Sequence, residues 1–600
     1  MTIIEKILAN HSKAVAVKPG DILDVEIDAR VARDFGGANV VKNIQDNALG
    51  IADPDRTFFT FDCNPTGSDQ KYTANQQFCR VFAREYGIKV YDINRGIGTH
   101  LLIEEGLVYP GATAVSTDSH ANILGAVGAF GQGMGDKDIA AAWSKGKIWF
   151  KVPESVKLII NGKIPEKVSA KDIVLCLLAR FGANTFLGKS IELYGEEIET
   201  LSLDKRITIA SMATEMGAVT ILIPPNQEVI SYCESRTDRK IDPVLSDPDA
   251  VYSDVIDLEA GDFIPMVSRP GKPHDAIPLD EVRGTPIDSV FIGSCTNGRI
   301  EDMRAVAKVL EDQIVADGVV LKIVPCTDRV WNMCLEEGLI EIFKDARAMV
   351  SNPGCAGCAA GQVGQNGPGE VSVSSGNRNF PGKQGMGEVY LASPEIAAAS
   401  AVSGFITSPD KMSDSPVERD PLPSTTVRKP SRTKSLKEDS PVEFTGHVWF
   451  INQDDIDTDM IYHNRHLSIT DIREMGKHAL GNLEGFESFA SEANQGDIIF
   501  AGKNFGAGSS RQQAVDCFKS LGVGCIVAVS FGSIYERNAI NAAFPILSSD
   551  KIDELELTTG DPVSVNVGTG KIVNLSNQKI IQANPFSDVQ MEIYQNGGLF

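Results

Sequence analysis

The sequence predicts an α/β protein with two folded modules, and three of its features support this fold class. Short runs rich in β-branched residues, such as VKLII and VTILI, alternate with amphipathic stretches along residues 1–407. Further along, GDIIFAG and GCIVAVS flank SSRQQAVDCFKSLG, a pattern typical of a strand–loop–helix–strand unit. Residues 408–444 differ from both regions, because they are rich in Pro, Ser and charge and poor in large apolar side chains.

The segment 408–444 cannot bury a core, so we expect it to be an exposed linker. A flexible chain of that length has an r.m.s. span of about 33 Å, which lets two folded bodies dock across a cleft. We therefore predict a large module before the linker and a small module over residues 445–600.

Individual elements follow from their side-chain patterns. Short β-branched runs predict buried strands at 156–160, 219–223, 290–293 and 320–324. Apolar residues at helical spacing predict helices at 171–181 and 302–313. The first residues, MTIIEKILANHSK, have an acid at Glu5 and no small-residue cleavage site, so they read as an amphipathic helix rather than a signal peptide.

Composition excludes several classes of protein. The 600 residues are too many for one ordinary domain, and no stretch approaches the ~18 uninterrupted apolar residues of a membrane helix. A net charge of −24 repels phosphate backbones, so no nucleic-acid partner is expected. Without a secretion signal or a membrane segment, we expect a cytoplasmic protein in which clustered cysteines bind metal.

Three of the eleven cysteines form a pattern suited to a soft metal centre. Cys295 closes the strand SVFIG, and Cys355 and Cys358 form a C-x-x-C pair in a Gly-rich loop. Three thiolates leave one coordination position open, whereas a structural zinc site is closed by four ligands. A redox pair or a chance spacing remain alternatives for the C-x-x-C pair taken alone.

Longer motifs give this pattern a context. FIGSCTNGRIEDMR, NPGCAGC, SGNRNFPGK and LASPEIAAASAVSG occur in this order, after TDSH and ASMATEMGA and before DDIDTDMI and KNFGAGSSR. These blocks resemble the aconitase superfamily over essentially the whole chain outside the linker. The resemblance implies aconitase-like α/β domains one and two over residues 1–290, a third domain over 291–407 and a swivelling domain over 445–600. It also implies a 4Fe–4S cluster held by Cys295, Cys355 and Cys358, with one labile iron open to substrate.

The motif KNFGAGSSR places Ser509 at a helix start, where free N–H groups and the helix dipole favour an anion. Arg511 adds a guanidinium suited to carboxylates. From the residues alone, Ser509 is either a helix cap or a proton-abstracting alkoxide. The resemblance implies the second role, with Ser509 as the catalytic base and Ser510 and Arg511 as substrate ligands.

Other side chains are candidate substrate ligands. Arg378 follows the apparent strand VSVSS and suits a carboxylate, although a surface salt bridge is the usual role of a lone arginine. The resemblance makes Arg378 a substrate ligand and Asn377 a neighbour of the cluster. Ser119, Lys383 and Arg465, the last in the loop after the Asp-Thr-Asp block, complete the predicted binding set.

Acid–base chemistry is expected from the TDSH block. Asp118 can orient His120 or shift its pKa toward neutrality, although Asp-x-His by itself is a weak pattern. Within the family block, Asp118 and His120 become catalytic candidates. The resemblance also makes Glu215 a carboxylate near the open iron, and Asp62 the acid of the family's Asp-His pair.

Several positions depart from the family pattern. The departures are Cys63 and Thr99 in place of two histidines, His100 in a glutamine position, Ser211 for an asparagine, Lys383 for an arginine and Gln512-Gln513 for Glu-His. Losing two imidazoles removes two proton carriers that suit neutral pH, and lysine lacks the planar fork of arginine. These changes predict a changed substrate.

We therefore predict a carbon–oxygen hydro-lyase that dehydrates, rehydrates and so isomerises a small hydroxy di- or tricarboxylic acid. A substituted malate such as 3-isopropylmalate is favoured, because the two modules resemble the large and small subunits of isopropylmalate isomerase. We also expect that no separate small subunit is required. The alternatives are a citrate or homocitrate hydratase of the aconitase type and a cluster-dependent, non-catalytic or RNA-binding regulator.

Overall fold

The structure is a computed structural model and divides into two compact units, residues 1–422 and 423–600. It describes residues 1–34, 36–65, 70–355, 363–412, 440–467, 469, 471–508 and 511–599, without the side chains of residues 70 and 71. Cys358, Ser509 and Ser510 lie outside the described residues, as do positions 413–439 of the expected linker. Among the described residues, no helix is both long and apolar enough to cross a membrane.

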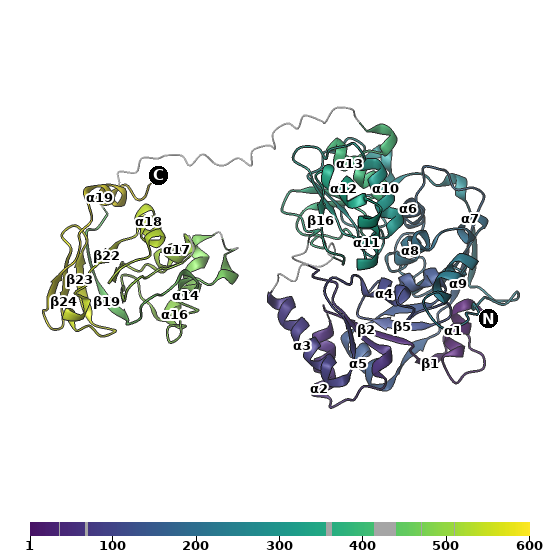
Figure 1. Ribbon diagram of the computed structural model, residues 1–600, viewed down its shortest axis with the longest axis horizontal. Helices are drawn as coiled ribbons and strands as arrows, with labels where there is room; N and C mark the ends of the chain where they lie inside the picture. Colours follow the sequence, from purple (N-terminus) through teal and green to yellow (C-terminus); the bar gives the residue numbers. More distant parts are fainter. Residues whose placement is uncertain are drawn as a thin grey trace. The chain divides into compact units, whose positions relative to one another are not determined.

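A five-stranded parallel sheet organises the first part of the large unit. Its order is β4–β3–β2–β5–β6, with β2 (Ala29–Arg33), β3 (Thr57–Thr60), β4 (Lys89–Tyr91), β5 (Thr113–Ser116) and β6 (Phe130–Gly133). Neighbouring side chains face opposite sides, so Phe59 and Phe58 belong to different hydrophobic cores. Over the first core lie α2 (Gly37–Asp46), α3 (Gln70–Tyr86) and α5 (Asp136–Lys145), and over the second α4 (Gly98–Glu104) and the 3-10 helix η2 (Ala121–Val127) (Figure 1).

The second part of the large unit is a four-stranded parallel sheet in the order β10–β9–β8–β11. Its strands are β8 (Ser155–Asn161), β9 (Ser190–Tyr194), β10 (Thr220–Leu222) and β11 (Asp254–Glu259). Its helices are α6 (Ala170–Phe181), α7 (Glu196–Glu199), α8 (Leu203–Ser211) and α9 (Gln227–Glu234). Helix α1 (Ile3–Asn10) and the antiparallel pair β1 (Ile22–Glu26) and β7 (Lys147–Lys151) contribute to the first hydrophobic core instead. Ser169 and Asp172 form a capping box that fixes the start of α6.

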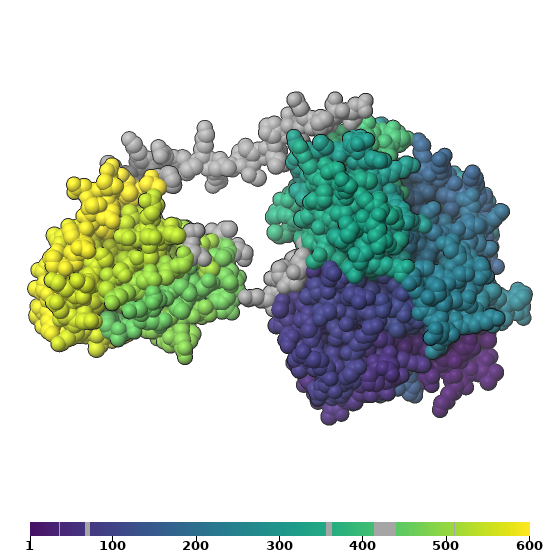
Figure 2. Space-filling view, in the orientation of Figure 1, coloured from purple at the N-terminus to yellow at the C-terminus, as the bar shows by residue number. Residues whose placement is uncertain are grey.

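The third part is a seven-stranded sheet in the order β13–β12–β18–β17–β14–β15–β16. Its strands are β12 (Met266–Ser268), β13 (Ala276–Pro278), β14 (Ser289–Ile292), β15 (Val320–Ile323), β16 (Met349–Val350), β17 (Val371–Ser374) and β18 (Glu388–Leu391). Strand β12 is antiparallel to both of its neighbours, β13 and β18, and the other pairs are parallel. The helices are α10 (Ile300–Leu310), α11 (Asp328–Glu336), α12 (Leu339–Asp345) and α13 (Pro394–Ser403), of which α10 and α13 lie side by side. The three parts pack directly against one another (Figure 2).

Strand register brings particular residues to the carboxyl edges of these sheets. In the first sheet Arg33 pairs with Thr60 and Val31 with Ser116, so the residues that follow β3 and β5 lie level with the end of β2. In the third sheet Phe291 pairs with Ser374, so the loops after β14 and β17 also begin side by side. Carboxyl edges of parallel strands are where α/β proteins bind ligands, and the predicted site residues of the large unit other than Glu215 follow strands of these two sheets.

The small unit is built on one mixed sheet in the order β22–β21–β20–β19–β23–β24–β25. The strands are β19 (Glu443–Ile451), β20 (Ile498–Ala501), β21 (Cys525–Ala528), β22 (Ile546–Ser548), β23 (Pro562–Asn566), β24 (Lys571–Asn574) and β25 (Ile580–Gln582). Its first four strands are parallel and the last three join in antiparallel fashion. The helices are α14 (Thr458–Ile461), α15 (Ile472–Met475), α16 (Phe489–Glu492), α17 (Gln513–Leu521), α18 (Ser533–Asn541) and α19 (Asp588–Gln595).

The predicted elements are confirmed. The β-branched runs form β8, β10, β14 and β15, the helical patterns form α6 and α10, and the first residues form α1. In the small unit β20 and β21 flank α17, as the strand–loop–helix–strand pattern predicts. The domain boundaries at 290, 407 and 444 stay a prediction; Lys411 bonds Asp280 of the large unit at 2.7 Å, and β19 begins at Glu443.

Candidate active site of the large unit

Arg33, the last residue of β2, joins two carboxylates at the edge of the first sheet. Its Nε lies 2.7 Å from Asp62 Oδ1, and its Nη1 lies 3.2 Å from Asp118 Oδ1. All three side chains are almost excluded from solvent, with exposed fractions of 11%, 0% and 4%. Burial opposes the charge of Arg33, but the two carboxylates outweigh it and raise the pKa of the guanidinium well above its ordinary value.

Asp62 is fully buried in a closely packed part of this edge. Its Oδ2 accepts a 2.8 Å hydrogen bond from the N–H of Gly98, where any Cβ would lie 2.4 Å from Thr60 Oγ1 and so force a shift. Burial raises the pKa of Asp62 to about 6, with Arg33 opposing and the nearby Asp34 and Asp118 adding to the rise. Cys63 is the third member of a buried group in which one donor atom each of Asp34, Asp62 and Cys63 lie within 4.8 Å of one another.

Asp118, His120 and Glu215 form a second buried chain. The Asp118 carboxylate accepts from the His120 backbone N–H at 3.0 Å, and His120 Nε2 lies 3.1 Å from Glu215 Oε1. Burial disfavours the imidazolium, but Cys295 and Glu215 outweigh it and raise the pKa of His120 to about 10. Burial likewise opposes the charge of Glu215, yet His120 and Arg378 hold the pKa of this carboxyl below its ordinary value. The Asp118 carboxylate therefore orients His120 by binding the backbone N–H of His120, and Glu215 contacts the imidazole ring.

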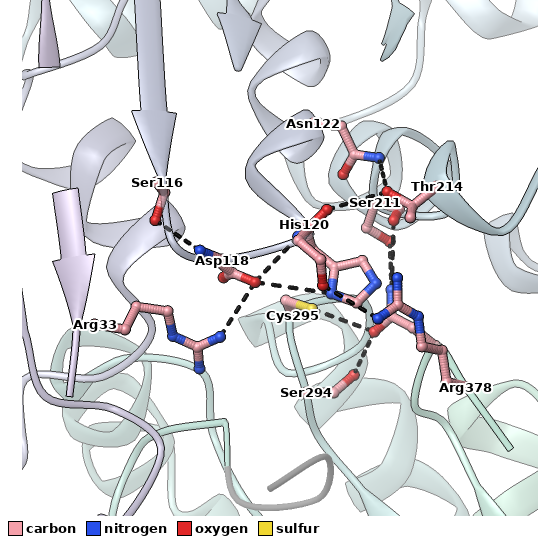
Figure 3. Close-up of polar contacts among 12 residues, drawn as sticks. Arg33, Ser116, Asp118, His120, Asn122, Ser211, Thr214, Ser294, Cys295 and Arg378 are labelled. Carbon is pink, nitrogen blue, oxygen red and sulfur yellow. Dashed lines mark hydrogen bonds and ion pairs between the residues drawn. The ribbon is translucent and has the colours of Figure 1, made fainter. Parts of the chain in front are cut away.

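Arg378, four residues past the end of β17, completes the chain. Its Nε donates to Glu215 Oε1 at 2.7 Å and its Nη1 to Ser119 Oγ at 3.1 Å. Figure 3 shows Asp118 and His120 between Arg33 on one side and Arg378 on the other, with Cys295 beside His120. The Arg378 side chain is 17% exposed, whereas Glu215 is 1% exposed, so the guanidinium is the accessible end of this pair.

Cys295 lies in the loop after β14. The preceding residue, Ser294, has φ 76°, in the left-handed region that residues other than glycine seldom adopt. The backbone therefore turns sharply just before Cys295. Cys295 Sγ lies 3.2 Å from Asn377 Oδ1, and its backbone carbonyl accepts from His100 Nε2 at 3.0 Å. Burial lowers the pKa of His100 to about 3, so its ring is neutral. The predicted cluster neighbour Asn377 thus contacts a predicted ligand.

Cys355 is brought to the same edge by a turn packed on the Asp62 loop. Its backbone N–H donates to the carbonyl of Asp62 at 2.9 Å. Cys295 and Cys355 are both buried, with 2% and 6% of their surfaces exposed. Two buried thiols at the same edge of the large unit fit a soft iron–sulfur centre. The third predicted ligand, Cys358, lies outside the described residues.

A cavity of about 350 Å³ opens beside Ser119. Its wall includes Thr117, Met134, Thr214 and Val219, and none of its described lining residues carries a charge. A larger cavity, of about 1150 Å³, lies elsewhere in the large unit. It lies among the first turns of α6, α8, α10 and α13, and none of the predicted site residues lines it.

The remaining predicted ligands belong to other parts of the chain. In the small unit Arg511 pairs with Asp459 at 2.5 Å and donates to the carbonyl of Tyr462 at 3.2 Å, while Arg465 is exposed. Lys383 is half-buried in the loop after Arg378. The predictions for Ser509 and Ser510 fall outside the described residues.

Sequence reasoning missed Arg33, Asp34 and the contact of His100 with Cys295. A signal for Arg33 exists, because it is the charged last residue of the strand ARVAR and stands where parallel strands bind ligands. Thr99, at the position of an expected histidine, is buried, and its Oγ1 has no partner among the described residues.

Known proteins provide comparisons for this site. The family model "Aconitase family (aconitate hydratase)" matches residues 5–404, and "Aconitase C-terminal domain" matches residues 429–550. A probable 3-isopropylmalate dehydratase large subunit from Methanothermobacter thermautotrophicus is 40% identical over 418 residues, which cover 69% of this chain and 99% of that protein. A 3-isopropylmalate dehydratase large subunit from Halothermothrix orenii is 41% identical over 419 residues, again 69% of this chain and 99% of that protein.

One solved structure resembles a smaller share of the chain. A 3-isopropylmalate dehydratase from Methanocaldococcus jannaschii is 34% identical, with a TM-score of 0.25, and the match covers 26% of this chain and 90% of that one. A TM-score this low does not establish a shared fold, so membership of a family rests on the sequence matches.

The prediction that no separate small subunit is required is wrong. The relatives matched along nearly their whole length are named large subunits, so the large unit corresponds to a protein that is one part of an assembly. The match of residues 429–550 to the aconitase C-terminal domain does not show that a separate small subunit is dispensable.

Proposed function

Because the chain belongs to the aconitase family and is a carbon–oxygen hydro-lyase, we propose that it dehydrates and rehydrates a hydroxy di- or tricarboxylic acid, most favourably a substituted malate such as 3-isopropylmalate. One observation carries this proposal. The ends of β2, β3, β5, β14 and β17 and the 3-10 helix η3 (Thr214–Met216) bring two arginines, three carboxylates and a histidine around Cys295.

The arginines supply the recognition of an acid substrate. Arg378 presents a partly exposed guanidinium that Glu215 and Ser119 hold in one orientation. A planar guanidinium binds a carboxylate through two parallel hydrogen bonds, which fixes the direction of the substrate as well as its charge. Arg33 is more deeply buried between Asp62 and Asp118, so its role is to hold these two acids in place.

The proposed cofactor is a 4Fe–4S cluster held by Cys295, Cys355 and Cys358. Its support is the soft donor set and the burial of the two described thiols. When bound, such a cluster supplies a Lewis-acidic iron that polarises a substrate hydroxyl. Asn377 and His100 contact Cys295 from two sides and keep its sulfur and carbonyl in position.

Proton movements fall to the chain's own side chains. We assign abstraction of the carbon-bound proton to Ser509, as the family resemblance implies. His120 is held between Glu215 and Asp118, and the Glu215 carboxylate, 3.1 Å from Nε2, favours the protonated ring by raising the pKa of His120. It is the group from which the departing hydroxyl receives a proton. Asp62, with a pKa of about 6, is the second acid at the same edge.

The cavity beside Ser119 supports a substituted malate over citrate or homocitrate. Ser119 contacts Arg378 and also lines the cavity, so a substrate bound to Arg378 extends one of its arms there. The described wall has no charged side chain. It combines Met134 and Val219 with hydroxyl groups and the amides of Asn122 and Gln132, which suits an uncharged substituent. A third carboxylate would lose its hydration in this cavity without gaining an opposite charge.

The test is proton exchange at carbon, followed by NMR in D2O. The full-length chain, reconstituted with iron and sulfide without oxygen, is incubated separately with 3-isopropylmalate, methyl-substituted malates, citrate, isocitrate and homocitrate. Deuterium incorporation into a substituted malate supports the proposal. Incorporation into citrate or homocitrate alone would overturn the substrate class, and incorporation into none, with a full cluster, would overturn the reaction.

Two variants test the proposed base. Ser509→Ala should abolish exchange. Ser587→Ala removes the serine that caps α19 with a capping box, and it should lower thermal stability slightly while exchange continues. If both variants retain exchange, Ser509 is a helix cap and not the base.

A further inference from the structure

Lys171 is a lysine without any exposed surface. It is the second residue of α6, which belongs to the second sheet of the large unit, and 0% of its surface is accessible. A lysine is an unexpected choice at this place. Burial of an ammonium is costly unless its donors are satisfied, and the start of a helix already carries a partial positive charge.

The Lys171 ammonium reaches across to the third sheet. Its Nζ donates to the carbonyl of Gly376 at 2.7 Å and lies 3.3 Å from the carbonyl of Ser375, more than 200 residues further along the chain. Nζ also lies 3.8 Å from Met212 Sδ, at the end of α8. The two carbonyls belong to the residues immediately before Asn377 and Arg378.

Those next two residues make the critical contacts of the site. Asn377 reaches Cys295 Sγ through Oδ1, and its Nδ2 lies 3.5 Å from Met212 Sδ. Arg378 reaches Glu215 and Ser119. A movement of the peptide between residues 375 and 377 would therefore displace the partner of a predicted cluster ligand and the predicted carboxylate grip together.

The start of α6 is well suited to act as a fixed support. Asp172, next to Lys171, accepts from the N–H of Ser169 at 2.9 Å and from the N–H of Met266 at 2.9 Å. The helix start is thus tied both to its own cap and to β12 of the third sheet. These bonds hold the start of α6 in place, whereas residues 375–378, which Lys171 contacts, belong to no helix or strand.

We propose that Lys171 is a positioning residue for the reaction, which sets Asn377 against Cys295 and Arg378 against Glu215 by holding the carbonyls of Ser375 and Gly376. This role rests on the proposed function for its catalytic consequence, but not for its structural one. Residues that orient ligands at one remove commonly contribute 10- to 100-fold to activity or metal affinity.

The experiment compares Lys171→Met with a matched control, Arg206→Met, in the full-length chain. Arg206 is also fully buried, and it bonds four backbone carbonyls, those of Leu201, Pro224, Ile198 and Glu199. These carbonyls do not adjoin the site residues. Arg206→Met leaves four backbone carbonyls without their donor, whereas Lys171→Met leaves two. The loss of overall stability should therefore be greater in the control.

Three measurements separate the possibilities. Amide hydrogen exchange of the peptide covering residues 371–380 should increase in Lys171→Met and remain unchanged in Arg206→Met. The kcat/KM of Lys171→Met should fall 10- to 100-fold, with both a lower kcat and a higher KM, and Lys171→Arg should recover part of it. The EPR spectrum of the reduced cluster should change in Lys171→Met only.

Unchanged exchange of residues 371–380 in Lys171→Met would overturn the proposal. So would a loosened loop with unchanged turnover and EPR spectrum, or an equal loss of turnover in Arg206→Met. Failure of the wild-type chain to turn over any substrate would defeat the proposed function alone, since the exchange of the loop decides the positioning role separately.

Discussion

Arg378 and Glu215 are 163 residues apart in the chain, yet Arg378 Nε and Glu215 Oε1 lie 2.7 Å apart. The same carboxylate oxygen lies 3.1 Å from His120 Nε2. Glu215 therefore links the group that we assign to substrate binding with the group that we assign to proton donation. A substrate carboxylate that pulls on Arg378 will alter the electrostatic field at His120, so binding and acid–base chemistry are connected through one buried oxygen.

Arg378→Lys tests this connection. Lysine keeps the charge but cannot contact Glu215 and Ser119 with separate nitrogens of a planar group. Loss of one hydrogen bond to a charged group costs about 1.5–3 kcal/mol, so kcat/KM should fall roughly 10- to 100-fold. Steady-state kinetics of dehydration measure the effect.

A surface pair gives the control. Arg304 bonds Glu337 through two nitrogens at 2.7 and 2.6 Å, with side chains 48% and 33% exposed. Arg304→Lys makes the same chemical change away from the site and should leave kcat/KM within about twofold, because exposed pairs contribute little. Equal losses in the two variants would show that Arg378 has no special role.

The predicted cluster ligands can be tested by removal of one thiol. Cys295→Ser should lose iron, sulfide and the brown colour, because a serine oxygen is a poor ligand for this soft centre. Cys517→Ser changes a fully buried cysteine of the small unit and should retain all three. Iron and sulfide assays after anaerobic reconstitution decide the matter, and a cluster of normal content in Cys295→Ser would contradict the assignment.

Cys63 should be chemically inert in the folded chain. Burial raises the pKa of its thiol well above the ordinary value, Arg33 opposes the rise and Asp34 adds to it. Iodoacetamide reacts with thiolates, so Cys63 should escape labelling at pH 8 until the chain is denatured. Mass spectrometry of the labelled peptides provides the measurement.

Cys176 serves as the internal reference for Cys63, because it is only partly buried. We expect Cys176 to be labelled first. Labelling of Cys63 at the rate of Cys176 would mean that the thiol is accessible and ionised, and a proton-donating role for it would then need to be considered.

Asp172 predicts a pH dependence of stability. Burial raises its pKa from 3.8 to about 6, despite the hydrogen bonds from Met266 and Ser169. A carboxyl whose pKa is higher in the folded state binds its proton more tightly there, so its contribution is largest at low pH and is lost as pH rises through 6. Between pH 5 and pH 7.5 this loss amounts to about 1.4 kcal/mol.

Asp172→Asn isolates this contribution, because asparagine does not titrate. The free energy of unfolding of the wild type minus that of the variant should fall by about 1.4 kcal/mol from pH 5 to pH 7.5. Urea denaturation at the two pH values gives the difference, in which the titration of all other groups cancels. A difference that is constant or grows with pH would contradict the assignment.

The sequence predicts the elements of the large unit well, because burial on both faces of a parallel strand leaves an uninterrupted apolar run. Val290–Ile292 illustrate this in β14, whereas the run that forms β15 is interrupted by Lys322. The positions of Cys295 and Arg378 just after strands could also be predicted, since they follow from local pattern and family motifs.

The sequence does not reveal which distant residues meet. Arg33 contacts Asp62 and Asp118, which are 29 and 85 residues away, and only the strand order β3–β2–β5 brings them together. Lys171 is another example, because a lysine in an amphipathic helix normally indicates a solvated face. Its burial follows from how the second sheet packs on the third, which no local pattern encodes.

In the sheet of the small unit, one strand, β19, joins the parallel part to the antiparallel part, because it pairs with β20 on one side and with β23 on the other. On a translating ribosome β20 emerges about 60 residues before β23, which at 5–20 residues per second is a delay of roughly 3 to 12 s. Throughout that delay one edge of β19 has no strand to cover it, and such an edge recruits strands from other nascent chains. Slow codons between residues 502 and 561 should therefore reduce the soluble yield of this protein, although they leave its sequence unchanged.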